Sequence, residues 1–579
     1  MSSKNLRGLS YRKGMDDNLF ENISKLATSN ASEEDFKQLA DDYHIGESVV
    51  LGTSTFYDFL RPENANKKVH VCNGTACMCA GTQDKLVEGL KEHFHEDEIG
   101  HVACLGHCHT NSAFMFDDKT YSASQADEIA EIVKSKPTKE NEYSTGSNTT
   151  PILSEDITDL KEFYSLLKKF ADNKQEIINN LKASNLRGRG GAGFPFFFKL
   201  DSASKVDEPS MNQKGHSQRD EYNLMRTPSD KNIKLYTDEK QKYIVCNADE
   251  GDPGAYSDMY LMEKHPHKVL FGMMIAGLAI GADTGVLYIR GEYPNSIRRI
   301  EKAINRLTAL NYVGENIMGI EGFNFNFKIT RGQGAYVCGE ETALLNSIEG
   351  LRPEVRVRPP YPTVEGLYGK PTVLSNVETF ANIHWILDNG GDAYAKLGTE
   401  KSKGTKLVSL DGFFNKPGVY EIEMGTPLET IFEEFGGGFK SEIKALQIGG
   451  PLGGIVPISK IKDLTLDFES LGDNGFLLGH ASFVSIPVDF PMIKFIDHLL
   501  KFTADESCGK CYPCRIGSKR GHELVVKAQN EDFKIDRQLF DDLLETLEIG
   551  SLCALGGGVP LPLKNAMEYF DGELKEYFN

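Results

Sequence analysis

Apolar residues follow two different patterns along this chain, a periodic spacing and short continuous runs, and these patterns separate helices from strands. From Asp159 to Ala183 they recur every three or four positions, which predicts a helix. The short apolar runs Tyr243 to Cys246 and Thr284 to Arg290 predict buried strands. Val269 to Ala282 is the longest uncharged apolar run; it is too short to cross a bilayer, so we expect a buried helix. Because helices and strands alternate from Leu160 to Gly350, the sequence predicts an α/β core.

The regions on either side of this core follow other patterns. Residues 17–62 have amphipathic helical spacing, and residues 67–133 predict the order β-α-β-β-α. Residues 406–457 are β-rich with glycine-rich turns, which favours a small β-grasp-like domain, and the chain is helical again from Pro491. A chain of 579 residues is too long for one core, so we expect three to five domains.

Two polar stretches separate these regions. Residues 134–150 contain few apolar residues and predict a linker, whereas residues 201–241 predict a polar surface insertion. The net charge of −20 disfavours nucleic-acid binding, which needs a basic face. The first residues contain no apolar core of a secretory signal, so we expect a cytoplasmic protein.

The stretch Leu186 to Pro195, L-R-G-R-G-G-A-G-F-P, concentrates glycine and arginine. Glycine lets backbone N–H groups approach an anion, and arginine adds charge-assisted donors, so the stretch predicts a phosphate cradle. Its spacing from Gly188 to Gly193 fits G-x-G-x-x-G, but that dinucleotide fingerprint requires a preceding strand, and here a helix is predicted. We therefore expect a non-Rossmann cradle; an ordinary glycine-rich turn is the alternative.

Hydrogen-bond acceptors follow the predicted strand at Tyr243 to Cys246. They are Asn247, Asp249, Glu250 and Asp252. Acceptors at the carboxyl end of a strand suit the hydroxyl groups of a ribose or ribityl chain, and an acidic turn is the alternative. The turn from Gly339 to Glu341 is a second candidate, because the helix expected near Thr342 would present its N-terminus to phosphate or hydroxyl groups.

The 11 cysteines fall into two clusters with two solitary cysteines between them. In a large chain without a signal peptide, clusters favour metal binding over disulfides. The first cluster has Cys-x4-Cys and Cys-x3-Cys spacing, which suits a [2Fe–2S] cluster better than zinc, the alternative. Four cysteines complete this set, so Cys79, His107 and His109 are not needed as ligands. The four are Cys72, Cys77, Cys104 and Cys108.

The second cluster has Cys-x2-Cys-x2-Cys spacing and one distant fourth cysteine. It comprises Cys508, Cys511, Cys514 and Cys553. Close spacing of three cysteines holds three corners of a cubane, so this pattern predicts a [4Fe–4S] cluster. Iron–sulfur clusters move single electrons and nicotinamide moves hydride, and a flavin is the usual adapter between them.

Six ordered motifs resemble the flavin-bearing, NADH-binding subunit of respiratory NADH dehydrogenase. They are L-R-G-R-G-G-A-G-F-P (186–195), N-A-D-E-G-D-P-G (247–254), G-A-Y-V-C-G-E-E-T-A-L-L (334–345), G-K-P-T-V-L-S-N-V-E-T (369–379), E-S-C-G-K-C-Y-P-C-R-I-G (506–517) and S-L-C-A-L-G-G (551–557). Residues 17–133 resemble the thioredoxin-like [2Fe–2S] partner subunit of that enzyme, fused in front. The fused arrangement resembles the diaphorase (beta) subunits of soluble NAD-dependent formate dehydrogenases and of some multimeric hydrogenases.

The resemblance implies a multidomain chain of the α/β and α+β classes. Its parts would be a helical segment with a thioredoxin-like [2Fe–2S] ferredoxin domain (14–133), the linker (134–150), a non-classical Rossmann-like FMN- and NAD-binding α/β domain (151–395), a β-grasp, ubiquitin-like domain (400–460) and a C-terminal helical [4Fe–4S] domain (485–579).

The resemblance also implies the residues of each site. FMN would be held by Gly188, Arg189, Gly190, Lys199, Asn247, Asp249, Glu250, Gly339, Glu340, Glu341 and Asn376. NAD(H) would lie near Phe194, Asp252, Tyr336, Arg358 and Tyr361. The [4Fe–4S] cluster would take Cys508, Cys511, Cys514 and Cys553, and the [2Fe–2S] cluster Cys72, Cys77, Cys104 and Cys108.

Some positions depart from the respiratory pattern. Leu200 stands where an aromatic residue is expected after Lys199, and Asp252 replaces a glutamate. Arg358 and Tyr361 stand in place of lysine and phenylalanine. An arginine could accept the 2′-phosphate of NADP, but we expect Arg358 to substitute for the lysine.

We predict a subunit that exchanges hydride with NAD(H) through FMN and relays electrons through its clusters, without side-chain acid–base catalysis. The other half-reaction needs a partner, and residues 506–517 favour a formate dehydrogenase catalytic subunit. The alternatives are a respiratory NADH:quinone subunit, a bifurcating-hydrogenase subunit, which the lack of a C-terminal two-cluster ferredoxin motif disfavours, and a non-enzymatic zinc-stapled scaffold. Any contact with a membrane would come through partners.

Overall fold

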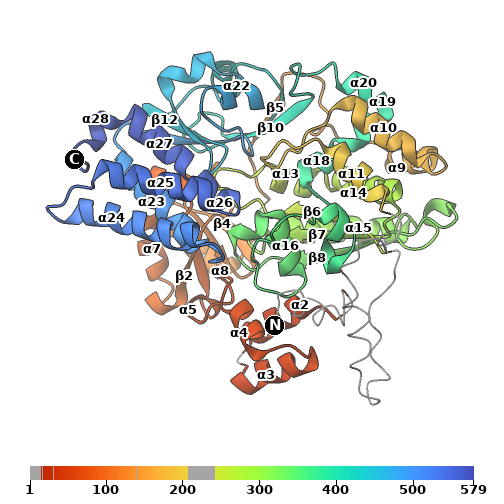
Figure 1. Cartoon of the computed structure of the whole chain (residues 1–579), viewed down its shortest axis with the longest axis horizontal. Helices are drawn as coiled ribbons and strands as arrows, with labels where there is room; N and C mark the ends of the chain where they lie inside the picture. Colours follow the sequence, from red (N-terminus) through yellow and green to blue (C-terminus); the bar gives the residue numbers. More distant parts are fainter. Residues whose placement is uncertain (1–14, 16, 30, 139, 207–240) are drawn as a thin grey trace.

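The central domain is built on a four-stranded parallel sheet with the strand order β8-β7-β6-β9 (Figure 1). The computed structural model describes residues 15, 17–29, 31–138, 140–206 and 241–579. The strands are β6 (Tyr243–Ala248), β7 (Thr284–Ile289), β8 (Asn326–Arg331) and β9 (Thr372–Asn376). The chain runs from β6 outward through β7 and β8, and places β9 on the other side of β6. The strand order therefore reverses between β6 and β9, which is where open α/β sheets bind ligands.

Helices cover both faces of this sheet. Alternate residues of β6 and β7 point to opposite faces, so one set packs on the buried helix α14 (Pro266–Ile280) and the other on α16 (Glu341–Ile348). The side of α14 also carries α9 (Leu160–Phe170), α10 (Lys174–Ser184), α11 (Phe196–Ser204), α13 (Ser257–Lys264), α15 (Pro294–Ala309), α18 (Val377–Ala381) and α19 (Ile383–Asn389). The predicted α/β core is confirmed, including the buried helix.

Two local predictions in this domain were wrong. The single helix expected from Asp159 to Ala183 is two helices, α9 and α10, because the polar residues Asp172 and Asn173 interrupt the apolar spacing. The strand expected before Gly339 is a short 3₁₀ turn, η3 (Tyr336–Gly339). Strand β8 ends before it, and Gly334, with φ of 77°, turns the chain out of the sheet.

The predicted insertion at 201–241 falls largely outside the described residues. Its first residues, Asp201 to Ser204, are the last turn of α11. The predicted start of the insertion at residue 201 was therefore too early, because helix α11, which carries Lys199, continues to Ser204.

The N-terminal region contains the predicted β-α-β-β-α elements, but also a short helix, α6, and a fourth strand, β4, that were not predicted. Helices α2 (Leu19–Ala27), α3 (Glu33–Asp42), α4 (Glu47–Ser54) and α5 (Pro62–Ala65) precede a sheet of order β2-β1-β3-β4. The sheet and its helices are β1 (Val69–Cys72), α6 (Thr75–Ala80), α7 (Gln83–Lys91), β2 (Ile99–Val102), β3 (Ala113–Phe116), β4 (Lys119–Ser122) and α8 (Ala126–Ser135). Strand β1 pairs parallel with β2 and antiparallel with β3, so the loops after β1 and β2 meet at one end of the sheet.

The β-grasp-like region is larger than predicted. Its six-stranded sheet has the order β13-β12-β14-β10-β11-β5. The strands are β5 (Ser144–Ser147), β10 (Thr405–Leu410), β11 (Gly418–Glu423), β12 (Ile443–Ile448), β13 (Gly454–Pro457) and β14 (Ser482–Pro487). The boundary at 460 was therefore wrong, because β14 pairs with both β10 and β12. Residues 134–150 are not only a linker, because β5 pairs with the edge strand β11.

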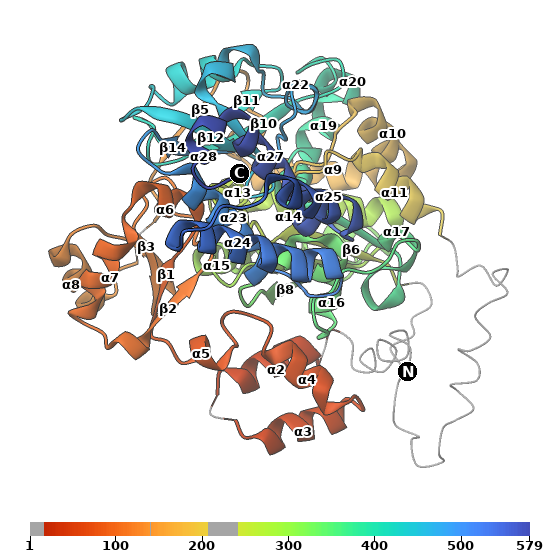
Figure 2. The same ribbon diagram turned by 60° about the vertical axis from the view of Figure 1, so that its left-hand side comes forward.

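The C-terminal region is helical, as predicted. Its helices are α23 (Met492–Asp505), η7 (Pro513–Gly517), α24 (Ser518–Asn530), α25 (Arg537–Gly550), α26 (Ala554–Gly558), α27 (Pro560–Tyr569) and α28 (Asp571–Leu574). They lie between the β-grasp domain and the N-terminal sheet (Figures 1 and 2), and Met78 and Cys79 pack on them. No helix in the described part of the chain is long and apolar enough to span a membrane.

Candidate flavin and iron–sulfur sites

The glycine loop is a closed turn that lies over the end of β9. Gly188 N donates to Phe194 O (2.8 Å), and Phe196 N donates to Leu186 O (2.9 Å), so the two ends of the loop hold each other. A Cβ atom on Gly190 would lie 2.9 Å from the Cβ of Asn376, which is closer than real Cβ contacts allow. Helix α10 leads into the loop, and no strand precedes it, as predicted. Glycine is required here because the backbone passes directly over Asn376.

The two arginines of the loop are directed into the protein. Arg187 donates to Gly193 O (2.7 Å) and pairs with Glu469 of the β-grasp domain (2.6 Å). Arg189 is fully buried, and its Nη2 donates to Tyr394 Oη (3.0 Å). The charge of Arg187 is therefore paired within the protein, and its predicted role as an anion donor stays a prediction. For Arg189, Nε and Nη1 are buried without a hydrogen-bond partner.

The carboxyl ends of β6 and β9 bring two predicted FMN residues together. Asn247 and Asn376 are direct neighbours in the parallel register of these strands. Asn247 Nδ2 donates to Gly339 O (2.8 Å), which ties the turn before α16 to the same edge. A Cβ on Gly339 would lie 3.2 Å from Asp249 O, so this turn also fits closely. The asparagines and both glycine turns thus surround the point where the strand order reverses.

Charged residues line the next part of this edge. Lys199 Nζ donates to Glu341 (3.0 Å) and to Leu374 O (2.9 Å), and Arg358 donates to the other oxygen of Glu341 (2.7 Å). Burial alone would raise the pKa of Glu341, but the two cations hold it below its ordinary value. Glu340 caps α16 by accepting from Thr342 N (2.9 Å). Lys199 and Arg358 are thus joined through one carboxylate, so Arg358 is not a free cation.

Asp249 and Glu250 are buried behind these residues. Burial raises the pKa of Asp249 well above its ordinary value, although Arg290 Nε lies 3.5 Å from its carboxylate. The Glu250 carboxylate accepts from Asp258 N (3.0 Å) and Met259 N (3.1 Å) at the start of α13. It is therefore already bound within the protein, and its role toward a ligand hydroxyl stays a prediction.

The residues predicted for NAD(H) include one hydrogen-bonded pair and two exposed aromatic rings. Tyr336 Oη donates to Asp252 Oδ1 (2.7 Å). Phe194 and Tyr361 are about half exposed, as aromatic rings that stack on a nucleotide must be. Phe198 was missed; it is exposed and its ring centre lies 6.0 Å from that of Phe194. Leu200, which stands where the aromatic residue was expected, is fully buried. Phe198, one position before Lys199, instead provides an exposed aromatic ring.

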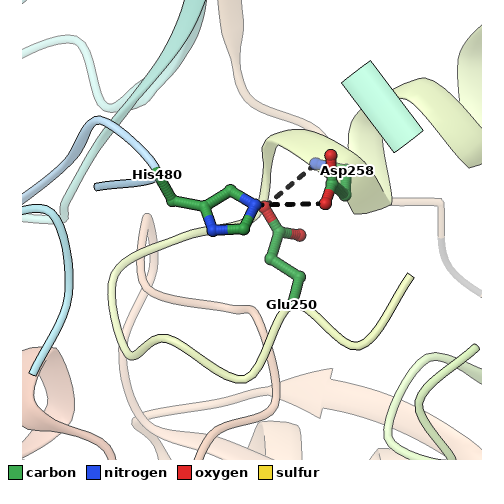
Figure 3. Close-up of side chains that lie close together, drawn as sticks. All are labelled: Glu250, Asp258 and His480. Atoms are coloured by element: carbon green, nitrogen blue, oxygen red, sulfur yellow. Dashed lines mark hydrogen bonds and ion pairs between the residues drawn. The ribbon is translucent and has the colours of Figure 1, made fainter. Parts of the chain in front are cut away.

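A second missed group lies beside Asp252. His480 Nδ1 is 3.2 Å from Asp252 Oδ2, and His480 Nε2 is 3.2 Å from Asp258 Oδ2. Figure 3 shows the imidazole pointing at Asp258, with Glu250 next to both. His480 belongs to the loop before β14, between the boundaries predicted for the β-grasp and C-terminal domains. No local spacing could have connected it to residues more than 200 positions earlier.

The four cysteines predicted for [2Fe–2S] meet at the loops after β1 and β2. All are buried, and the Sγ atoms of Cys104 and Cys108 are 3.8 Å apart. Backbone N–H groups of Gly74, Gly106 and Gly254 donate to sulfur atoms of this set at 3.2–3.5 Å. Such N–H donors stabilise thiolate charge around iron–sulfur clusters. The buried His107 and His109 lie next to this set and contact each other at 5.6 Å between ring centres.

The four cysteines predicted for [4Fe–4S] meet where η7 and α26 come together. Cys511, Cys514 and Cys553 border one apolar cluster with Phe502, and Cys508 and Cys553 border another. In the described part of the chain, three ligand atoms of His, Cys, Asp or Glu within 4.8 Å of one another occur only in Glu250, Asp258 and His480. Thiolates at about 2.3 Å around one zinc ion would be closer than that, so both cysteine sets fit multi-iron clusters. This geometry favours iron–sulfur clusters over the zinc-stapled alternative.

Comparison with known proteins identifies the family. A model of the Nuo51 FMN-binding domain matches residues 227–385, the NADH-ubiquinone oxidoreductase-F iron–sulfur binding region matches 494–577, and the thioredoxin-like [2Fe–2S] ferredoxin matches 24–136. The mitochondrial NADH-ubiquinone oxidoreductase 51 kDa subunit of Neurospora crassa is 35% identical over 405 residues, which cover 69% of this chain and 76% of that protein. The chain belongs to this family of NADH-binding flavin and iron–sulfur subunits. The predicted resemblance, the fold class and the three cofactors are confirmed.

Other members match more of the chain. The NADP-reducing hydrogenase subunit HndC of Solidesulfovibrio fructosivorans is 39% identical over 428 residues, 73% of this chain and 80% of that protein. The NAD-reducing hydrogenase HoxS subunit alpha of Cupriavidus necator is 31% identical over 561 residues, 90% of this chain and 85% of that protein. The solved structure of an NAD⁺-reducing [NiFe]-hydrogenase in its H2-reduced state superposes with a TM-score of 0.81 at 25% identity, over 97% of this chain and 94% of that one.

Proposed function

We propose that this chain oxidises or reduces NAD(H) at FMN and exchanges the electrons, one at a time, with a partner subunit through its two iron–sulfur clusters. When bound, FMN would supply the conversion between two-electron hydride transfer and one-electron transfer. The chain's own residues bind and orient the two nucleotides and keep water from the buried edge of β6 and β9. The residues predicted for FMN and NAD(H) keep those roles as part of this proposal.

One observation carries the proposal: the [2Fe–2S] cysteines contact the flavin motif directly. Gly254, at the end of the motif at 247–254, donates its N–H to Cys108 Sγ (3.2 Å). Arg290 donates to Cys104 O (2.9 Å) and to Glu250 O (2.8 Å), and so bridges the same two segments. Electron transfer between the two cofactors would therefore cross only a few packed side chains.

The contacts of Arg358 support NAD(H) as the nucleotide. A 2′-phosphate needs an unpaired cation, but Arg358 is bound by Glu341, and Glu340 lies 3.9 Å away. The match to a subunit of an NADP-reducing enzyme makes NADP(H) the competing substrate.

The experiment is anaerobic titration of the purified full-length chain with NADH. We expect the flavin absorbance to bleach with reduction of at least one cluster, while NADPH has little effect. A protein without FMN, or one reduced only by NADPH, would contradict this proposal.

The partner is the subunit that activates the second substrate. Exposed apolar residues surround the [4Fe–4S] cysteines, Tyr512 at 78% and Ile549 at 76% exposure, which supports contact with a partner there. The match to the HoxS subunit alpha over 90% of this chain favours a hydrogenase-type partner, whereas the motif at 506–517 is the argument for formate dehydrogenase. Purification of the native complex from the cytoplasm separates them: nickel in the largest subunit supports the first, and molybdenum or tungsten supports the second.

A further inference from the structure

The β-grasp domain supplies one side of the nucleotide site. Arg187 of the glycine loop pairs with Glu469, and its guanidinium lies 4.2 Å from the ring centre of Phe468. A Cβ on Gly450 would lie 2.6 Å from the carboxyl carbon of Asp252, so a second loop of the β-grasp domain touches this residue. The domain is therefore part of the site.

The loop that carries His480 is held rigidly. Gly479 (φ 51°) comes so close to Gly449 that a Cβ on it would lie 2.3 Å from Gly449 O. Ala481, on the other side of His480, has φ of 56°, a conformation that L-residues rarely adopt. A backbone outlier of this kind persists where the surrounding contacts fix it, and such positions concentrate at functional sites.

His480 joins the residues assigned to the two nucleotides. Its Nδ1 faces Asp252, which also accepts from Tyr336, and its Nε2 faces Asp258. Asp258 in turn accepts from Asn376 Nδ2 (2.6 Å). One chain of hydrogen bonds therefore runs from Tyr336 to Asn376, with His480 at its centre.

Both imidazole nitrogens face carboxylate oxygens, and this arrangement favours the doubly protonated, cationic imidazole. Burial opposes the charged form of His480, but hydrogen bonds and charge from Asp252 and Asp258 raise its pKa well above the ordinary value. Burial and the charge of Asp258 raise the pKa of Glu250 to about 7; the charge of His480 opposes this rise but does not cancel it. The positive charge of His480 thus offsets the negative charge of the neighbouring carboxyl groups of Asp252, Asp258 and Glu250.

We propose that His480 is a positioning residue that fixes Asp252 for the nicotinamide nucleotide and, through Asp258, Asn376 for the flavin. This role rests on the proposed function, because it needs NAD(H) and FMN in this site. It gives the β-grasp domain a direct part in nucleotide binding.

The test compares His480→Gln with the wild type in the full-length, FMN-loaded chain, using NADH and an artificial one-electron acceptor. Glutamine is polar but uncharged, so it cannot act as a cation that donates hydrogen bonds to both Asp252 and Asp258. We expect KM for NADH to rise about tenfold while kcat stays within about twofold. Asp252→Asn should give a similar rise, and the double variant should be no worse than either single variant. His522→Gln is the matched control, because His522 pairs with Asp497 (2.7 Å) in the C-terminal helices.

The alternative is a metal ion held by Glu250, Asp258 and His480, whose ligand atoms lie within 4.8 Å of one another. Stoichiometric non-iron metal in the wild type that is lost in His480→Gln would overturn the positioning role, as would an unchanged KM or additive effects in the double variant. If His480→Gln does not fold, Asp258→Asn removes one of the two anchors and should raise KM in the same way. A wild type that NADH does not reduce contradicts the proposed function itself. A wild type that NADH reduces, together with a His480→Gln variant whose KM for NADH is unchanged, contradicts only the role of His480.

Discussion

At the scale of single residues, the predicted nucleotide site depends on glycines that let the backbone approach polar side chains closely. Gly190 and Gly450 each leave room that a Cβ would occupy, the first against Asn376 and the second against Asp252. Gly190 does not have a positive φ, so the requirement there is for space alone, whereas Gly450 also has φ of 87°. Side chains such as Arg187 and Arg189, in contrast, stabilise the loop from within.

This account predicts the effect of Gly190→Ala. The new methyl group would collide with Asn376 and displace the loop from β9, so we expect the Kd for FMN to rise about tenfold, in line with the cost of overpacking. Fluorescence titration of the flavin-free protein with FMN measures it. Gly572→Ala is the control, because nothing lies within 4 Å of a Cβ at Gly572. Equal FMN affinity in both variants would show that the loop does not contact the flavin.

At the scale of elements, the predicted iron–sulfur ligands lie at or near the ends of short elements. Cys72 ends β1, Cys77 lies in α6, and Cys104 and Cys108 follow β2. Cys514 belongs to η7, and Cys553 caps the start of α26. These positions could be predicted because the ligand spacing is local in sequence. The strand β5 could not be predicted in the same way, because its four residues are polar and gain their structure by pairing with β11.

We predict that Cys553→Ser removes one cluster and leaves the other. Iron content should fall by about four atoms per chain, and the [4Fe–4S] signal in low-temperature EPR of the reduced protein should disappear. Cys79→Ala is the control, because Cys79 is buried among the C-terminal helices and should leave both signals intact. A variant Cys553→Ser that keeps its full iron content would contradict the ligand assignment.

At the scale of the whole molecule, the sites form where domains meet. The flavin edge of the central sheet contacts the [2Fe–2S] loops on one side and the β-grasp loops on another. The ion pair of Arg187 and Glu469 joins the glycine loop to the β-grasp domain and is mostly buried. We therefore expect nucleotide binding to be coupled to the docking of these domains.

A double-mutant cycle on Arg187→Gln and Glu469→Gln tests that coupling. A partly buried pair of this geometry is worth about 1 kcal/mol, so we expect each single variant to weaken FMN binding several-fold and the double variant to be no weaker than the singles. FMN titration of the four proteins measures it. Lys501→Gln, which removes an exposed pair with Asp505, should leave the affinity unchanged. Additive losses in the cycle would mean that the pair does not link the two domains.

The sequence by itself determined the glycine loop and the α/β core and predicted the cysteine ligand sets, because each depends on spacing within a short stretch. The order of strands around β6, the addition of β5 to a distant sheet and the meeting of His480 with Asp252 and Asp258 depended on the tertiary structure. His480 is an isolated histidine in a glycine-rich loop, and nothing beside it in sequence indicates a partner. Its role arises because the folded β-grasp domain carries it across to two carboxylates that it could not reach through local structure.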